Sequence, residues 1–190
     1  MKGERCFSAK CAMVKRNYAP GMHGPKGNQR VSQFGQQLRE KQKALKTYRL
    51  LERQFSEYYQ KAKVSKGDTG ENILRLLETR LDNAIFRAGL SKSRDGARQL
   101  ITHGNILVND RKVDIPSYQL KTNDEISIKE ASLKKEYFQE ILKKINKKDM
   151  PSWLGFTDEK SGKIKVLGYP TSEDIKQNIN AALIVEYYSR

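Results

Sequence analysis

Apolar residues change their spacing along the chain, and the change marks a small mixed unit near its middle. From Ile73 to Ala88 they recur every three or four residues, which predicts one helix that ends at Gly89. A second helix is predicted up to Gly104, with Ser91 or Ser93 as its N-cap. On that helix Arg94 and Arg98 are four residues apart and share an outer face.

From residue 105 to residue 128 the apolar period becomes two, which predicts strands. Ile106 and Val108 alternate before a turn at Asn109-Asp110, and residues 113–115 alternate after it. Ile126 and Ile128 indicate a third strand. Asparagine and aspartate tolerate positive φ, so a two-residue hairpin turn fits here. We therefore predict a compact helix–helix–β-hairpin unit in this part of the chain.

Helical spacing also flanks this unit. Ser32 can cap a helix over residues 33–47, and further helices are predicted over 51–64 and 131–148, the last with Tyr137 in its apolar stripe. A strand pair is predicted over 153–166 and a terminal strand over 182–188. Tyrosines of the first two helices have two interpretations, because they can pack in a core or stack on RNA bases; they are Tyr48, Tyr58 and Tyr59.

Residues 1–31 are dense in glycine and proline, which blocks regular structure. They are either a disordered basic tail or an arm that becomes ordered on RNA, with glycines that let the backbone approach phosphates.

Charge narrows the class of partner. The net charge of the 190 residues is +15, and residues 1–66 carry 16 basic and 4 acidic side chains, a net +12. Residues 67–130 are neutral and residues 131–190 carry +3. Such an excess indicates a polyanion as partner. No apolar run approaches the ~20 residues that span a bilayer, and the N-terminus has no apolar signal region, so we expect no membrane association and no secretion.

Several motifs follow one another in the order that is typical of small-subunit ribosomal protein S4. They are Lys2 to Cys6, Lys10-Cys11-Ala12, Tyr18 to Gly24, Leu38 to Lys43, Leu77 to Asn83, Ser93 to Gly104, Val113 to Tyr118 and Val185 to Arg190. The chain therefore resembles the bacterial-type S4 family over nearly its whole length. The resemblance implies an α+β fold with an extended basic arm (1–31), a mostly helical body with C-terminal strands (32–78 and 130–190) and an inserted S4-like RNA-binding module (79–129).

The same resemblance implies a function. Members of this family bind 16S ribosomal RNA at a 5′-domain junction early in assembly of the small subunit in the cytoplasm. They contact ribosomal protein S5 and other small-subunit proteins, lie near the path along which mRNA enters, and influence translational accuracy. Some also repress translation.

An RNA-modifying enzyme is the alternative, since pseudouridine synthases and some tRNA synthetases carry the same module. About 60 residues on each side of the module are too few for a second catalytic domain. We therefore expect no enzymatic activity.

The predicted RNA contacts combine cations for phosphates with amides, a hydroxyl and imidazoles for riboses and base edges. They are Arg5, Lys10, Lys15, Arg16, His23, Lys26, Arg30, Arg39, Lys41, Lys43, Arg80, Asn83, Arg87, Ser93, Arg94, Arg98, Gln99 and His103.

Cys6 and Cys11 match the second half of a four-cysteine zinc pattern that one branch of the family carries. A structural zinc ion takes four protein ligands, and two thiolates with His23 make at most three. We expect no required cofactor, and zinc only if a cysteine pair precedes Met1.

Overall fold

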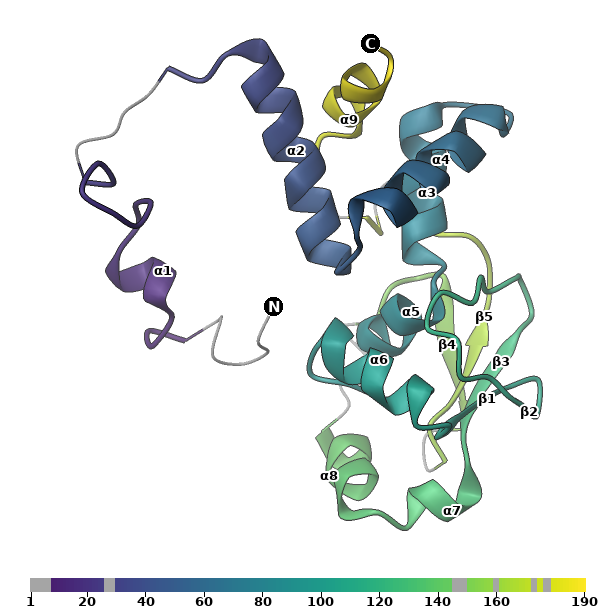
Figure 1. Cartoon of the computed structure of the whole chain (residues 1–190). Helices are drawn as coiled ribbons and strands as arrows, with labels where there is room; N and C mark the ends of the chain where they lie inside the picture. Colours follow the sequence, from purple (N-terminus) through teal and green to yellow (C-terminus); the bar gives the residue numbers. More distant parts are fainter. Residues whose placement is uncertain (1–7, 26–29, 145–149, 159–160, 172–173, 176–178) are drawn as a thin grey trace.

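Two packed units and an N-terminal arm make up the protein in its computed structural model (Figure 1). The structure describes residues 8–25, 30–144, 150–158, 161–171, 174–175 and 179–190. The helices are α1 (Ala12–Lys15), α2 (Gln33–Tyr48), α3 (Glu52–Val64), α4 (Thr69–Glu78), α5 (Leu81–Arg87), α6 (Arg94–Thr102), α7 (Glu130–Leu133), α8 (Glu136–Lys144) and α9 (Ala181–Tyr188). The strands are β1 (Ile106–Val108), β2 (Arg111–Lys112), β3 (Glu125–Ile128), β4 (Leu154–Asp158) and β5 (Lys163–Val166). This mixture confirms the predicted α+β class.

The first unit, here called the helical unit, contains α2, α3, α4 and α9 around one buried cluster. Ser32 Oγ accepts a hydrogen bond from the Gly35 amide at 3.2 Å, which confirms the predicted N-cap of α2. Tyr48, Tyr58 and Tyr59 are 1%, 8% and 2% exposed. They are core residues, so the interpretation that they stack on RNA bases is wrong.

The prediction of a terminal strand over 182–188 is also wrong, because these residues belong to α9. The apolar run that favours a strand supplies one side of a helix instead, and Ile184 is fully buried in the helical unit. Asn180 caps α9 by accepting from the Ala182 and Leu183 amides. α9 packs on α2 and α4, so the C-terminal helix and the first long helix of the chain meet in this unit (Figure 1).

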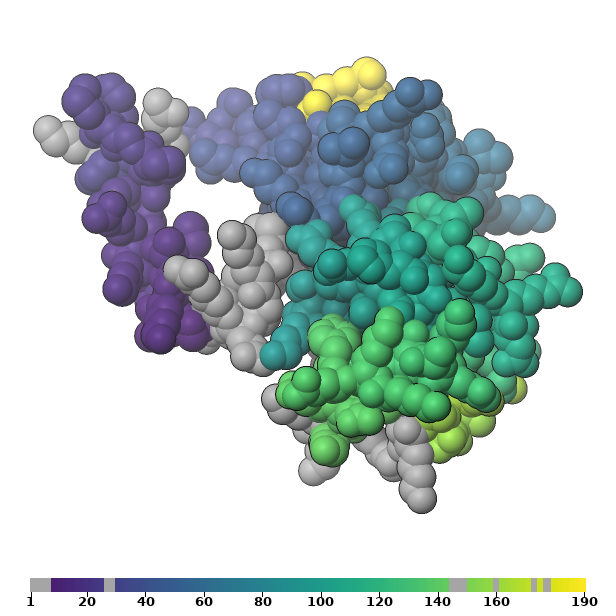
Figure 2. Space-filling model, turned by 60° about the horizontal axis from the view of Figure 1, so that its bottom comes forward, coloured from purple at the N-terminus to yellow at the C-terminus, as the bar shows by residue number. Residues whose placement is uncertain are grey.

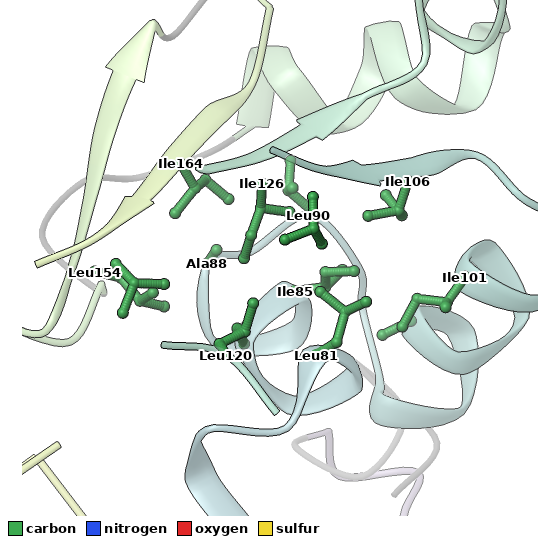
Figure 3. Close-up of a cluster of buried hydrophobic side chains, with 14 of the residues drawn as sticks. Leu81, Ile85, Ala88, Leu90, Ile101, Ile106, Leu120, Ile126, Leu154 and Ile164 are labelled. Carbon is green, nitrogen blue, oxygen red and sulfur yellow. The ribbon is translucent and has the colours of Figure 1, made fainter. Parts of the chain in front are cut away.

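The second unit, here called the sheet unit, contains α5 to α8 and an antiparallel sheet with strand order β2-β1-β3-β5-β4. Side chains of the sheet such as Ile126 and Ile164 face Ile85 and Ile101 of the helices (Figure 3). β5 pairs with β3 through the partners Ile126 and Ile164. The predicted strand pair therefore exists, but it extends the sheet of the predicted RNA-binding module and not the helical body to which the sequence assigned it.

The predicted single helix over residues 73–88 is two helices. Thr79 Oγ1 donates to the Arg75 carbonyl at 2.9 Å, and Arg80 is extended and bridges Gln119. The Leu81 amide then bonds the Tyr118 carbonyl, so a neighbouring strand-like segment takes over from the helical hydrogen bonds. One continuous apolar stripe thus serves two cores, with Ile73 in the helical unit and Ile85 in the sheet unit.

Two other sequence predictions need correction. The helix predicted over 131–148 is interrupted between α7 and α8, and residues 145–148 lie outside the described part. The alternation at Val113 and Ile115 does not continue the hairpin: β2 ends at Lys112, and Ile115 is 57% exposed. A period of two over three residues is too short to distinguish a strand from an extended loop.

The hairpin turn agrees with its prediction. Asn109 has φ 49° and Asp110 has φ 59°, as a type I′ turn requires. Asn109 Nδ2 also donates to Asp124 Oδ1 at 2.9 Å, which ties the turn to the start of β3.

In the described part of the chain, no helix combines the length and the apolar character that crossing a membrane demands.

Replacement of Asp110 by glycine should stabilise the protein by up to about 1 kcal/mol, because glycine adopts positive φ without steric cost. Urea unfolding monitored by circular dichroism measures this change. Asp114→Gly is the matched control, since Asp114 has no positive φ, and it should destabilise by about 0.4–1 kcal/mol. Equal effects of the two substitutions would contradict the assignment of the turn.

Candidate nucleic-acid interface

The N-terminal arm, residues 8–25 and 30–31 of the described chain, extends to one side of both units and joins them through α2 (Figures 1 and 2). α1 has no buried residue. The predicted contacts that the structure describes in this arm are all exposed: Lys10, Lys15, Arg16, His23 and Arg30. Arg5 and Lys26 lie outside the described residues. The arm therefore presents its cations without a core of its own.

Backbone geometry fixes a tight turn within this arm. Gly21 has φ +104°, and a Cβ on Gly24 would lie 1.7 Å from the Ala19 carbonyl oxygen. Only glycine fits at Gly24, because the obstacle is backbone and cannot move aside. The turn places exposed Met22 next to His23.

Along α2 the predicted contacts separate by burial. Arg39 and Lys43 are exposed, and Lys43 pairs with Glu40 at 2.5 Å. Lys41 is 3% exposed, donates to Glu52 Oε2 at 2.7 Å and lies 4.4 Å from the ring centroid of Tyr187. The prediction that Lys41 binds RNA is wrong, because its charge is satisfied inside the helical unit, where it joins α2 to α3 and α9.

Two buried carboxylates organise the boundary between the two units. Glu78 is 1% exposed and accepts from the Tyr48 hydroxyl at 2.6 Å, from Asn83 Nδ2 at 2.7 Å and from Arg87 Nη2 at 2.9 Å. Tyr48 comes from α2, Glu78 from α4, and Asn83 and Arg87 from α5. One carboxylate thus connects three helices.

The second carboxylate is Asp82, which is 2% exposed. It accepts from Arg80 Nη2 at 2.7 Å and from Arg98 Nη2 at 3.1 Å. Arg98 also donates to the Arg49 carbonyl at 2.9 Å, at the C-terminal end of α2. Because Arg98 lies on α6, this contact ties the sheet unit to the helical unit.

Arg94 completes the group. Its Nε donates to Asn83 Oδ1 at 2.8 Å, and its guanidinium lies over the rings of Phe86 at 4.6 Å and Tyr48 at 5.0 Å. We call these residues the junction cluster: Tyr48, Glu78, Arg80, Asp82, Asn83, Arg87, Arg94 and Arg98.

The pKa shifts follow from burial and from these partners. Burial raises the pKa of Tyr48 well above its usual value, and the Glu78 carboxylate raises it further, so Tyr48 stays a donor. Burial opposes the charge of Arg80, but Asp82 outweighs that effect and raises the pKa of Arg80. Burial lowers the pKa of Arg94, which nevertheless remains charged, as arginine does throughout proteins.

Burial in the junction cluster reduces the set of residues that can contact RNA. Arg80 and Asn83 are 2% and 0% exposed, so the prediction that they contact RNA directly is wrong. Arg87 and Arg98 keep 24% and 33% of their side chains exposed and present one edge to the surface. The outer face predicted for Arg94 and Arg98 is instead turned toward the helical unit.

A cavity of about 390 Å³ brings together the remaining predicted residues of the module. Ser93, Gln99 and His103 line it from α6 and its ends. Lys92, Lys135 and Tyr137 line it as well, and sequence reasoning missed Lys135 and Tyr137. The signal for Tyr137 was its place among lysines, but its helical spacing favoured a core position.

The described residues do not form a zinc site. Cys11 is half-buried and unpaired there, Cys6 lies outside the described part, and no group of three metal-ligating side chains occurs among the residues searched. Zinc binding by this chain thus stays a prediction that depends on further ligands.

Comparison with known proteins gives matches over the whole chain. The family model for the ribosomal protein S4/S9 N-terminal domain matches residues 1–78, and the S4 domain model matches residues 79–126. Small ribosomal subunit protein uS4 of Clostridium beijerinckii is 51% identical over 100% of this chain and 90% of that protein. Proteins of the same description are 49% identical in Clostridium novyi (uS4A) and 48% identical in Heliobacterium modesticaldum (uS4), with the same coverage.

Replacement of Glu78 by alanine should destabilise the protein by about 3–5 kcal/mol, because it leaves buried Tyr48 and half-buried Arg87 without their acceptor. Glu57→Ala is the matched control: Glu57 keeps 60% of its side chain exposed and should change the stability by less than about 0.5 kcal/mol. Chemical unfolding of both variants gives the values. Similar losses in the two would contradict the organising role of Glu78.

Stability should also depend on Glu52. Burial opposes its ionisation, but hydrogen bonds from Lys41 and Tyr188 outweigh burial and lower its pKa below 4.5. This contribution is present above pH 4.5 and is lost as the pH falls through the lower folded value. Thermal melts of the wild type and Glu52→Gln should therefore differ at pH 7 and converge in acid. A difference that persists below the folded pKa would contradict this assignment.

Proposed function

Because the chain belongs to the ribosomal protein S4 family, we propose that it is a structural constituent of the small ribosomal subunit that binds 16S ribosomal RNA directly. It acts as a binding protein and not as an enzyme.

The distribution of exposed charge carries this proposal. Residues 1–66 have a net charge of +12, and the described basic side chains of the arm are exposed on a segment without buried residues in α1. A segment that concentrates positive charge and has no core is disfavoured by repulsion between its own cations. Phosphates of a nucleic acid neutralise these cations, and binding releases the counterions of the phosphates. The arm thus supplies affinity, and the two packed units supply shape.

The contact set is smaller than the one predicted from sequence, because the buried members Lys41, Arg80 and Asn83 are removed. Arg5 and Lys26, which lie outside the described residues, stay predicted contacts. In the arm and on α2 it keeps Lys10, Lys15, Arg16, His23, Arg30, Arg39 and Lys43. In the module it keeps Arg87, Ser93, Arg94, Arg98, Gln99 and His103. Folded RNA is recognised mainly by its shape, so a rigid pair of units with a basic arm suits a junction of helices in the 5′ domain. Early binding there would let the protein nucleate assembly of that domain.

Protein partners would use other surfaces. Phe34 is 46% exposed and Leu51 is 74% exposed on the helical unit, and exposed apolar side chains suit a protein neighbour better than RNA. We propose that ribosomal protein S5 contacts the helical unit near the path along which mRNA enters, and that the protein influences translational accuracy from there. Repression of translation would use the RNA-binding surface on an mRNA that folds in a similar way.

Binding to a transcript of the 16S 5′ domain tests the proposal. The triple variant Lys15→Gln, Arg16→Gln, Arg30→Gln should bind more weakly and reduce the salt slope of log affinity by about 0.7–0.9 for each phosphate that is no longer neutralised. The double variant Lys63→Gln, Lys163→Gln is the control, because both lysines are exposed outside the contact set. Filter binding between about 50 and 300 mM salt gives both quantities. An unchanged slope in the triple variant would contradict the role of the arm.

A further inference from the structure

A cavity of the size of a ligand site lies between α6 and α8, outside the junction cluster. Its floor contains the apolar side chains Leu100 and Phe138, and its rim is polar. Its volume of about 390 Å³ lies within the range of small-molecule sites, roughly 300–1,000 Å³. Figure 2 shows the α7–α8 segment against the module on the face that is turned forward. α8 follows the part of the chain that the S4 domain model matches, so the module alone does not make this cavity.

The charge of the lining indicates an anionic ligand. Lys92 and Lys135 line the cavity, and none of the described residues that line it is acidic. The two other cavities described in this structure each include a carboxylate, Glu57 in one and Glu71 in the other. Cations line those cavities as well, so what distinguishes this one is that no carboxylate accompanies its cations among the described lining residues.

One of its cations is held in place by the protein. Lys135 Nζ donates to Asn105 Oδ1 at 2.9 Å, and Ser132 Oγ donates to the same oxygen at 2.9 Å. Asn105 is only 6% exposed, so it is a fixed anchor at the start of β1. An ammonium group has three donors, and this bond uses one of them. The neutral side-chain amide of Asn105 thus holds the ammonium group of Lys135 at a defined place without cancelling its charge.

An aromatic ring supplies the second feature. Tyr137 lines the cavity and is 40% exposed, while Phe138 next to it is 1% exposed in the core of the sheet unit. The two rings meet edge to face, with centroids 5.4 Å apart at 85°. The buried ring therefore restrains the exposed one, whose other surface is open to a planar ligand.

We propose that this cavity receives an unpaired nucleobase of the ribosomal RNA, which stacks on Tyr137 while its flanking phosphate binds Lys92 and Lys135. Gln99 and His103 offer hydrogen bonds to the edge of the base. The inference rests on the proposed function, since it assumes that the chain binds ribosomal RNA. A single nucleotide combines a planar apolar face with an adjacent negative charge, and the cavity combines an aromatic ring and an apolar floor with adjacent cations.

The experiment combines affinity with a nucleotide-resolution readout on a transcript of the 16S 5′ domain. Dimethyl sulfate and 2′-hydroxyl acylation report which unpaired nucleotides the bound protein protects. Tyr137→Ala should weaken binding about fivefold or more, the size of one base-stacking interaction, and should restore the reactivity of one protected nucleotide. Tyr137→Phe keeps the ring and should retain both. Lys135→Gln should reduce the salt slope by about 0.7–0.9.

Tyr169→Ala is the matched control, because Tyr169 is also an exposed tyrosine, 54% accessible, and lines a different cavity. Circular dichroism confirms that each variant is folded. Failure of the wild type to bind the transcript more tightly than an unrelated RNA of equal length would overturn the proposed function. Tight binding by the wild type, with the same affinity and the same protections in Tyr137→Ala, would overturn the nucleobase site alone.

Discussion

Two buried carboxylates, Glu78 and Asp82, hold the two units of this protein together. Each lies at the boundary between the cores and accepts hydrogen bonds from arginine on a different helix, Arg87 for Glu78 and Arg98 for Asp82. A buried carboxylate is costly unless its oxygens are satisfied, and here charge-assisted hydrogen bonds satisfy them. The requirement acts in both directions, because the arginines would be equally costly without the carboxylates. These paired carboxylates and arginines therefore set the relative placement of α2, α4, α5 and α6.

This arrangement divides the positive charge of the chain into two kinds. Arg80 and Lys41 are committed inside the protein, where Asp82 and Glu52 neutralise them. Cations on the arm and on the outer side of α2 are among those that remain exposed. In the proposed function, affinity for a polyanion thus belongs mainly to the arm, while the internal arginines keep the surface rigid enough to fit a folded RNA.

The sheet unit shows how segments outside the RNA-binding module complete its surface. β4 and β5 pair with each other, and β5 pairs with β3. Gly162, which precedes β5, lies against Leu142 of α8, since a Cβ at this position would be 2.8 Å from the Leu142 side chain. This support places Lys135 and Tyr137 beside the start of α6. The cavity there is thus a product of the whole chain, and the proposed nucleobase site follows from packing between segments that are distant in sequence.

The sequence by itself determined the family, the α+β class, the cap Ser32 and the turn at Asn109-Asp110, because these depend on order, composition and local geometry. It left the cap of α6 open between Ser91 and Ser93, and the structure shows that Ser93 accepts from the Gly96 amide. Only the tertiary structure decided where the stripe from Ile73 to Ala88 breaks, since the segment around Gln119 competes for the backbone of Thr79 and Arg80. It also decided which arginines face solvent, because an exposed cation and a buried paired one have the same spacing along a helix. Whether an arginine is exposed or buried and paired depends on partner residues that are far away in the sequence.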